Sequence, residues 1–200
     1  MSEPPMRTDA EMDAMVVGKP EVLDGHIVLA EYDQSWSSLY AAEEARVRAS
    51  LGNQVLLVEH VGSTSVPGIA AKPRIDIVLT VSDSSDEPSY LPALEGAGYI
   101  LRVREPDWHE HRCFNGPDVD VNLHVFSDGC LEVARMQAFR DHLRRSAEDR
   151  ARYEQAKRAL AARRWKYTQH YADAKSVVVE EILVNAGIGP LTPESCGCAN

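Results

Sequence analysis

Residues 56–81 read LLVEHVGSTSVPGIAAKPRIDIVLTV, and this stretch decides the fold. Its two apolar runs, residues 56–58 and 75–81, are rich in Val, Ile and Leu and short enough to be strands. The loop between them consists largely of Gly, Ser, Thr and Pro. Gly62 and Gly68 permit a positive φ or a close backbone approach, and the loop hydroxyls with Lys72 can hold a phosphate group. The alternative is a turn whose hydroxyls bond to its own backbone.

Composition indicates one domain with an uneven charge. The 200 residues carry a net charge of -10, which argues against general nucleic-acid binding. Between residues 132 and 175, however, twelve Lys and Arg face six Asp and Glu. This basic segment indicates either a confined anionic ligand, such as a nucleotide, or a solvated helix face.

Targeting and redox features are few. The acidic N-terminus lacks a signal core, and no stretch approaches the roughly 18 apolar residues of a membrane span. We therefore expect a cytoplasmic protein without a membrane partner. The four cysteines lack paired zinc spacing and are expected to be reduced, and Cys196-x-Cys198 alone supplies only two ligands.

Periodicity predicts an α/β domain over residues 25–188, between a flexible arm (1–24) and a flexible tail (189–200). The predicted mixed sheet has flanking helices and a C-terminal helical part that closes one side. Its strands are expected at residues 26–30, 56–58, 75–81, 99–103, 112–114 and 118–126. Helices are expected at residues 37–51, 90–97, 131–145, 147–167 and 172–186.

The segment DVDVNLHVF, residues 118–126, alternates strictly between polar and apolar positions. In a strand, its valines and leucine form a buried face, and Asp118, Asp120, Asn122 and His124 share the other. If this strand lies near residues 75–81, Asp76 faces three of these polar residues across a cleft beside the Gly62 loop. Asp76 with Asp120 can then hold Mg²⁺, or Asp76 can form a structural salt bridge to Arg74 or a basic helix residue.

The basic helices hold pairs with one-turn spacing, which places both members of each pair on one helix face. Arg can form two bonds to a phosphate group and Lys can neutralise it, whereas the alternative is ion pairing on the helix surface. The pairs are Arg140 with Arg144, Tyr153 with Lys157, and Tyr171 with Lys175. His109 and His111 lack metalloprotease spacing, so we expect loop histidines with a surface role.

The motif EHVGSTSVPGIAAKPRIDI resembles the signature of the GrpB family, also called UPF0157. The resemblance continues through NLHVF, FRDHLR and the Tyr/Lys pairs, over roughly residues 27–186. That family is similar to the nucleotidyltransferase superfamily, whose pattern is a Gly-Ser loop followed by a strand carrying Asp-x-Asp. Aligned on Gly62-Ser63, the acidic pair falls at Arg74 and Asp76, so only the second carboxylate is present.

The resemblance implies a nucleotidyltransferase fold and an enzyme that transfers a nucleotidyl group from a nucleoside triphosphate, with Mg²⁺, to a small-molecule acceptor. The expected catalytic residues are Asp76 and Asp120, which also hold the metal together with His124. The expected nucleotide-binding residues are Gly62, Ser63, Thr64, Ser65, Lys72, Arg140, Arg144, Tyr153, Lys157 and Lys175. Two alternatives remain, because Arg74 occupies an acidic motif position: a noncatalytic nucleotide- or coenzyme-binding module, and a nucleotide-dependent, ligase-like enzyme.

Overall fold

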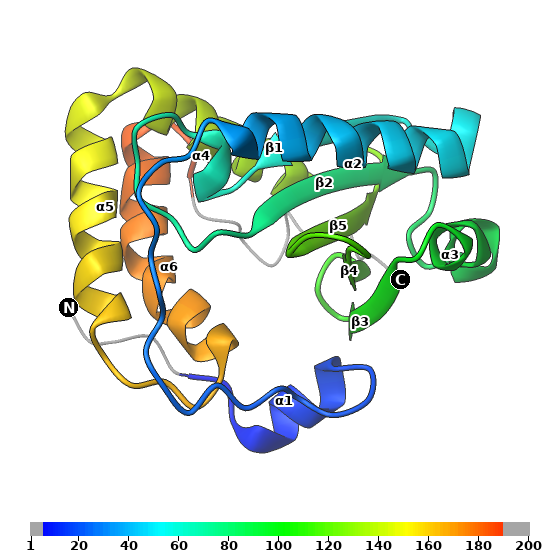
Figure 1. Ribbon diagram of the computed structural model, residues 1–200, viewed down its shortest axis with the longest axis horizontal. Coiled ribbons are helices and arrows are strands. Elements are labelled where there is room, and N and C mark those ends of the chain that lie inside the picture. The colour runs from blue at the N-terminus through cyan, green and yellow to red at the C-terminus, as the bar shows by residue number, and fades with distance from the viewer. Residues whose placement is uncertain (1–5, 190–200) are drawn as a thin grey trace.

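The computed structural model describes residues 6–189 and contains a five-stranded mixed sheet (Figure 1). The strand order is β1-β2-β5-β4-β3, in which only the central β2 and β5 are parallel to each other. The strands are β1 (Leu57–Val61), β2 (Ile75–Val81), β3 (Ile100–Glu105), β4 (His111–Asn115) and β5 (Val121–Ser127). The prediction of a mixed α/β fold is therefore confirmed.

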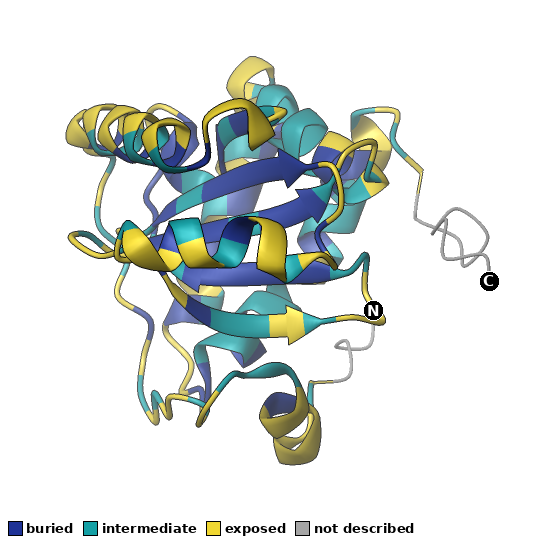
Figure 2. Cartoon of the chain, turned by 90° about the vertical axis from the view of Figure 1, so that its right-hand side faces the viewer, coloured by how far each residue is buried: buried dark blue, intermediate teal, exposed yellow. Residues whose placement is uncertain are grey.

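One face of the sheet packs against α2 (Ser35–Leu51) and α3 (Glu87–Gly96) and forms the main core. Val47 of α2 and Leu94 of α3 contribute to it, together with the alternate residues Ile75, Ile77 and Leu79 of β2. Figure 2 shows strands that are mostly buried, whereas the helices around them carry exposed outer faces. Burying such apolar side chains contributes roughly 1.5–3 kcal/mol each, so this face supplies much of the stability.

On the opposite side, α4 (Leu131–Arg145) contacts β1, and α5 (Ala147–Ala161) and α6 (Thr168–Asn185) pack on α4 and on each other. Val133 of α4 packs on Val78 and Phe126 of the sheet. Helices α5 and α6 lie side by side in Figure 1, with Tyr153 and Ile182 in one apolar cluster. The predicted C-terminal helical part is thus present and rests on the polar side of the sheet.

The predicted strand at residues 26–30 is wrong. Residues in this region form only isolated bridges, Gly25 with Trp165 and Ala30 with Ala71. Single bridges arise because the chain here crosses other segments without running alongside one sheet edge. The reciprocal backbone bonds between Gly25 and Trp165 also explain why α5 ends at Ala161, before the predicted residue 167.

The N-terminal segment contains a short helix, α1 (Asp9–Met15), which the sequence did not indicate. Thr8 and Glu11 form a capping box at its start. Arg7 pairs with Asp173 at 2.7 Å and with Glu105 at 3.3 Å, which links this segment to α6 and β3. The flexibility of the arm remains a prediction, and the expected tail with Cys196 and Cys198 lies outside the described residues, apart from its first residue.

Within residues 6–189, no helix is both long and apolar enough to cross a membrane.

Candidate functional site

A cavity of about 1030 Å³ lies between the polar face of the sheet, helices α4 and α6, and the N-terminal segment. Asp76 of β2 and His124 of β5 form part of its floor, and Met136 and Lys175 of the two helices line its walls. Met12 of α1 lines another side. The cavity therefore joins the central strands to the basic helices, as a ligand site between them requires.

The loop after β1 brings Gly62 and Ser63 to this cavity. Gly62 has φ 68° and ψ -173°, a conformation essentially restricted to glycine. A Cβ atom at this position would collide with Oδ2 of Asp76 and lie 2.9 Å from its Cβ. Glycine is thus required because the Asp76 carboxylate packs directly on the loop backbone.

Thr64 and Ser65, both predicted to bind nucleotide, use their hydroxyls inside the loop. Thr64 donates to the carbonyl of Arg74 at 3.1 Å, and its oxygen lies 3.0 Å from Nε2 of His60. Burial lowers the pKa of His60 to about 4, so this imidazole is neutral at pH 7. Ser65 donates to the carbonyl of Gly62 at 2.6 Å. These two residues shape the loop, and neither lines the cavity.

Asp76 stands at the centre of the polar face. Asn122, its register partner on β5, donates to Oδ1 at 3.0 Å, and Nε2 of His124 lies 3.9 Å from the same atom. Burial would favour a neutral Asp76, but the nearby charge of His124 and the hydrogen bond from Asn122 hold its pKa below the ordinary value. The carboxylate is therefore ionised at pH 7.

Asp120 lies elsewhere. Nε of Arg74 donates to Oδ1 of Asp120 at 2.6 Å, and the Asp120 side chain is 45% exposed. It borders a smaller neighbouring pocket of about 310 Å³. Of the predicted metal ligands, the structure thus brings Asp76 and His124 together but pairs Asp120 with Arg74, outside the lining of the larger cavity.

Seven Lys and Arg side chains line the cavity alongside seven Asp and Glu; four of these cations are Lys72, Arg74, Lys157 and Lys175. Lys157 is 1% exposed and donates to the Ala70 carbonyl at 2.5 Å, and burial lowers its pKa to about 7, with a further contribution from Lys175. Burial also lowers the pKa of Lys72, and the neighbouring positive charge of Arg74 lowers it further. Across the described part of the chain, none of the three lysines forms an ion pair with a carboxylate.

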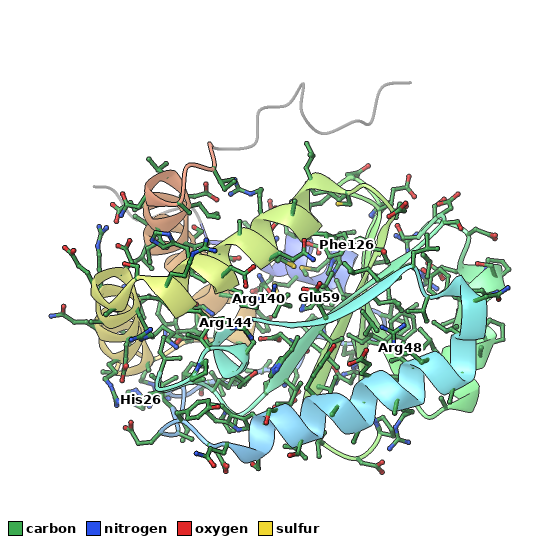
Figure 3. All side chains as sticks on the ribbon, turned by 90° about the horizontal axis from the view of Figure 1, so that it is seen from above. His26, Arg48, Glu59, Phe126, Arg140 and Arg144 are labelled. Atoms are coloured by element: carbon green, nitrogen blue, oxygen red, sulfur yellow. The ribbon has the colours of Figure 1, made fainter. Side chains whose placement is uncertain are left out.

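The remaining predicted residues support the loop from outside the cavity. Arg140 lies beside Glu59 (Figure 3) and donates to it at 2.6 Å, and it also donates to the His60 carbonyl at 3.0 Å. Arg144 donates to the Ser65 carbonyl at 2.8 Å. Tyr153 is 4% exposed in the apolar cluster between the helices. Helical spacing placed the two arginines on one face correctly, and that face meets β1 and the loop.

Comparisons with known proteins identify the family. The family model described as GrpB protein matches residues 26–185. The chain belongs to the GrpB family. A UPF0157 protein from Halalkalibacterium halodurans is 55% identical over 180 residues, covering 90% of this chain and 92% of that protein. One from Streptomyces coelicolor is 48% identical over 172 residues, covering 86% and 89%.

A solved structure supports the same assignment. The crystal structure of the conserved protein GrpB from Enterococcus faecalis aligns with a TM-score of 0.68 at 26% identity, covering 80% of this chain and 96% of that one. The GrpB fold is therefore shared along most of both chains. These descriptions name a family and no ligand, so the function must be argued from the cavity.

Two further residues, His111 and Cys113, line this cavity although the sequence did not predict them there. His111 begins β4 and is 4% exposed, so the expectation of a surface loop histidine was wrong. Its Nδ1 lies 2.8 Å from Glu105 and its Nε2 lies 2.9 Å from Nδ1 of His124. Burial lowers the pKa of His111 to about 4. Although burial alone would lower it, the pKa of His124 is raised by Cys113 and Asp76.

The alternation in HRCFN was the signal for these residues, because it places His111 and Cys113 on one strand face. Antiparallel pairing of β4 with β5 then sets Cys113 directly opposite His124. The sequence indicated both strands but not that they are neighbours.

Proposed function

We propose that the cavity binds a small phosphate-bearing molecule, a nucleotide or a nucleotide-containing coenzyme, with its phosphates against Lys72, Arg74, Lys157 and Lys175. One observation carries this proposal: three lysines and an arginine line one cavity, and the lysines have no carboxylate partner within residues 6–189. Asp120 and Asp76 raise the pKa of Lys72, but burial and the charge of Arg74 outweigh them. The charges of these lysines are therefore available to a ligand.

Electrostatics favours an anion at this position. Like charges that are partly removed from water repel each other, and the lowered pKa values of Lys72 and Lys157 reflect burial and this repulsion. A phosphate group among them would form charge-assisted hydrogen bonds, each contributing roughly 1.5–3 kcal/mol. The volume of about 1030 Å³ is at the upper end of small-molecule pockets, which leaves room for a nucleoside beyond the phosphates.

Nucleotidyl transfer is the second candidate, favoured by the direct packing of Asp76 on Gly62. This contact places a carboxylate beside a Gly-Ser loop, as the superfamily pattern requires. Mg²⁺ is commonly held by one or two carboxylates together with substrate phosphates and water, and Asp76 fits as a single carboxylate. A bound Mg²⁺ would polarise a phosphoryl oxygen. Lys72 and Lys175 would hold the phosphates, and the acceptor would be a small molecule.

A thermal-stability screen tests ligand binding. Nucleoside mono-, di- and triphosphates, pyrophosphate and adenine-containing coenzymes are added with Mg²⁺ or with a chelator, because a ligand that binds the native state raises Tm. We expect at least one phosphate compound to stabilise the wild type, and the shift to fall in Lys72→Met and Lys175→Met. Arg48→Met is the matched control, since this cation lies on α2 and pairs with Glu44 (Figure 3). Equal shifts in all variants, or none in the wild type, would refute the proposal.

The two candidates differ in their dependence on metal and in their products. If transfer occurs, pyrophosphate release from a nucleoside triphosphate requires Mg²⁺ and disappears in Asp76→Asn, which keeps the side-chain shape but removes the charge. If the cavity only binds, affinity persists in the chelator and no product forms. Product formation that is equal in Asp76→Asn and wild type would exclude the role given to Asp76.

A further inference from the structure

We infer that His111, Cys113 and His124 form a zinc-binding site whose remaining coordination position opens into the cavity. One nitrogen of each histidine and the sulfur of Cys113 all lie within 4.8 Å of one another. His111 and Cys113 are 4% and 6% exposed, and the His124 side chain is 20% exposed. The three side chains also line the cavity, so an ion among them would be reached from there.

The sheet itself builds the cluster. His111 and Cys113 are two positions apart on β4, so they point to the same face, and Cys113 is the register partner of His124 on β5. Three donors therefore come from two adjacent strands of the central sheet, without a flexible loop. Strands of a central sheet are rigid, so the positions of the three ligands are fixed before the ion binds, which suits a metal site.

Each histidine is oriented by a carboxylate on the side away from the cluster. Glu105 Oε2 lies 2.8 Å from Nδ1 of His111, which turns Nε2 of that ring toward His124. On the other ring, Nδ1 faces His111 and Nε2 lies 3.9 Å from Asp76. Metal-binding histidines characteristically present their second nitrogen to a carboxylate, a carbonyl or water. The ligand atoms are thus Nε2 of His111, Nδ1 of His124 and Sγ of Cys113.

The distances fit one ion after the side chains adjust, because any donor pair near the 4.8 Å limit would have to close by about 1 Å. Tetrahedral zinc with Zn–N bonds of about 2.0–2.1 Å and a Zn–S bond of about 2.3 Å separates its ligand atoms by roughly 3.3–3.6 Å. The two facing histidine nitrogens, now 2.9 Å apart, would separate by about half an ångström. The stacked rings allow this by a small rotation, because their planes are inclined by only 22°.

Ligand chemistry selects the metal. Thiolate and imidazole are the donors that zinc prefers, whereas Mg²⁺ takes oxygen ligands. Trp108 and Phe126 pack on His111 with ring centroids 5.2 and 4.7 Å away and shield one side of the cluster. Three protein ligands leave one position for water or a ligand group, the arrangement of catalytic rather than structural zinc sites. This site is independent of the proposed phosphate site, since it needs none of the four cations.

The test is metal titration of full-length protein in which Cys196 and Cys198 are replaced by Ser, because these thiols would otherwise compete. Zn²⁺ is titrated in competition with a chromophoric chelator, and Co²⁺ reports the ligands by its visible bands and thiolate charge-transfer absorption. We expect one ion per chain and a thiolate-to-cobalt band in this background. Adding Cys113→Ser should abolish the band and weaken zinc binding at least tenfold, while Cys130→Ser, the matched thiol control, changes neither.

His124→Gln provides a second test that does not depend on the folding of the Cys113 variant. It should likewise weaken zinc binding at least tenfold, and Glu105→Gln, which removes the charge that orients His111, should weaken it less and leave the cobalt band in place. Absence of zinc binding in the background protein would overturn the inference. So would one-to-one binding that persists unchanged in the Cys113 or the His124 variant.

Discussion

The glycine at position 62 gives the sharpest prediction, because the chain offers a matched control six residues later. Gly62 and Gly68 both have positive φ, 68° and 77°, but their surroundings differ. A Cβ at Gly62 would collide with the Asp76 carboxylate, whereas a Cβ at Gly68 would meet nothing within 4 Å. Alanine at either position carries backbone strain, and only alanine at 62 must also move Asp76.

The magnitudes follow from these contacts. The conformation of Gly62 costs an alanine roughly 1–3 kcal/mol. Displacing Asp76 also breaks its 3.0 Å hydrogen bond from Asn122, which contributes about 1.5–3 kcal/mol because the acceptor is charged. Gly62→Ala should therefore lower the free energy of unfolding by about 3–5 kcal/mol, and Gly68→Ala by about 1–2 kcal/mol.

Equilibrium unfolding in urea measures this difference, with thermal melting as a second readout. For a chain of this size, a difference of about 2–3 kcal/mol corresponds to roughly 4–12 °C in Tm. A third variant, Gly62→Ala with Asp76→Ala, removes the clash with the carboxylate but keeps the 2.9 Å contact with the Cβ of residue 76, so it should recover only part of the loss. Equal destabilisation by the two single alanines would show that the Asp76 contact is unimportant and would refute this explanation of Gly62.

Two other predictions concern the basic helices. Lys157 has a native pKa of about 7 against the ordinary lysine value of 10.5, so the cost of burying its charge is complete below pH 7 and disappears as pH rises toward 10.5. In urea unfolding at pH 6, Lys157→Met should stabilise the protein by on the order of 2 kcal/mol, after the lost hydrogen bond to Ala70 is subtracted. This gain in stability should vanish near pH 10. A gain that does not depend on pH would contradict the burial of a titrating lysine. Arg140→Ala should lower the free energy of unfolding by about 1.5–3 kcal/mol, because it leaves Glu59 without its partner. Ligand affinity should stay unchanged in the thermal-stability screen. A loss of affinity without a loss of stability would instead place Arg140 in the site.

Strand periodicity allowed the centre of the site to be predicted from sequence. The alternation in residues 118–126 placed Asn122 and His124 on one face, and the structure sets Asn122 beside Asp76 across the β2–β5 pair. The alternation of side chains between two faces is a local property of any strand, so it can be predicted without knowledge of the fold. The same holds for α4, which begins and ends where its apolar stripe predicted, at Leu131 and Arg145.

Partner choice could not be predicted, because it is a tertiary property. Asp120 shares a face with Asn122 in sequence, yet its carboxylate turns to Arg74. Thr64 offers a hydroxyl to any phosphate, yet in the structure this hydroxyl donates to the Arg74 carbonyl. His111 stands at the border of a charged turn and a strand, so its burial depended on the pairing of β4 with β5.

Isothermal titration calorimetry at pH 8 in a chelator tests the central claim, that phosphates bind against the lysines of the cavity. The titrant is the phosphate compound that stabilises the wild type most, measured in two buffers of different ionisation enthalpy. Lys157 is mostly neutral at this pH, and a nearby anion should raise its pKa. The account predicts proton uptake on binding, a roughly tenfold or greater loss of affinity in Lys175→Met, and unchanged affinity in Arg48→Met. Binding without proton uptake and with equal affinity in all three proteins would contradict it.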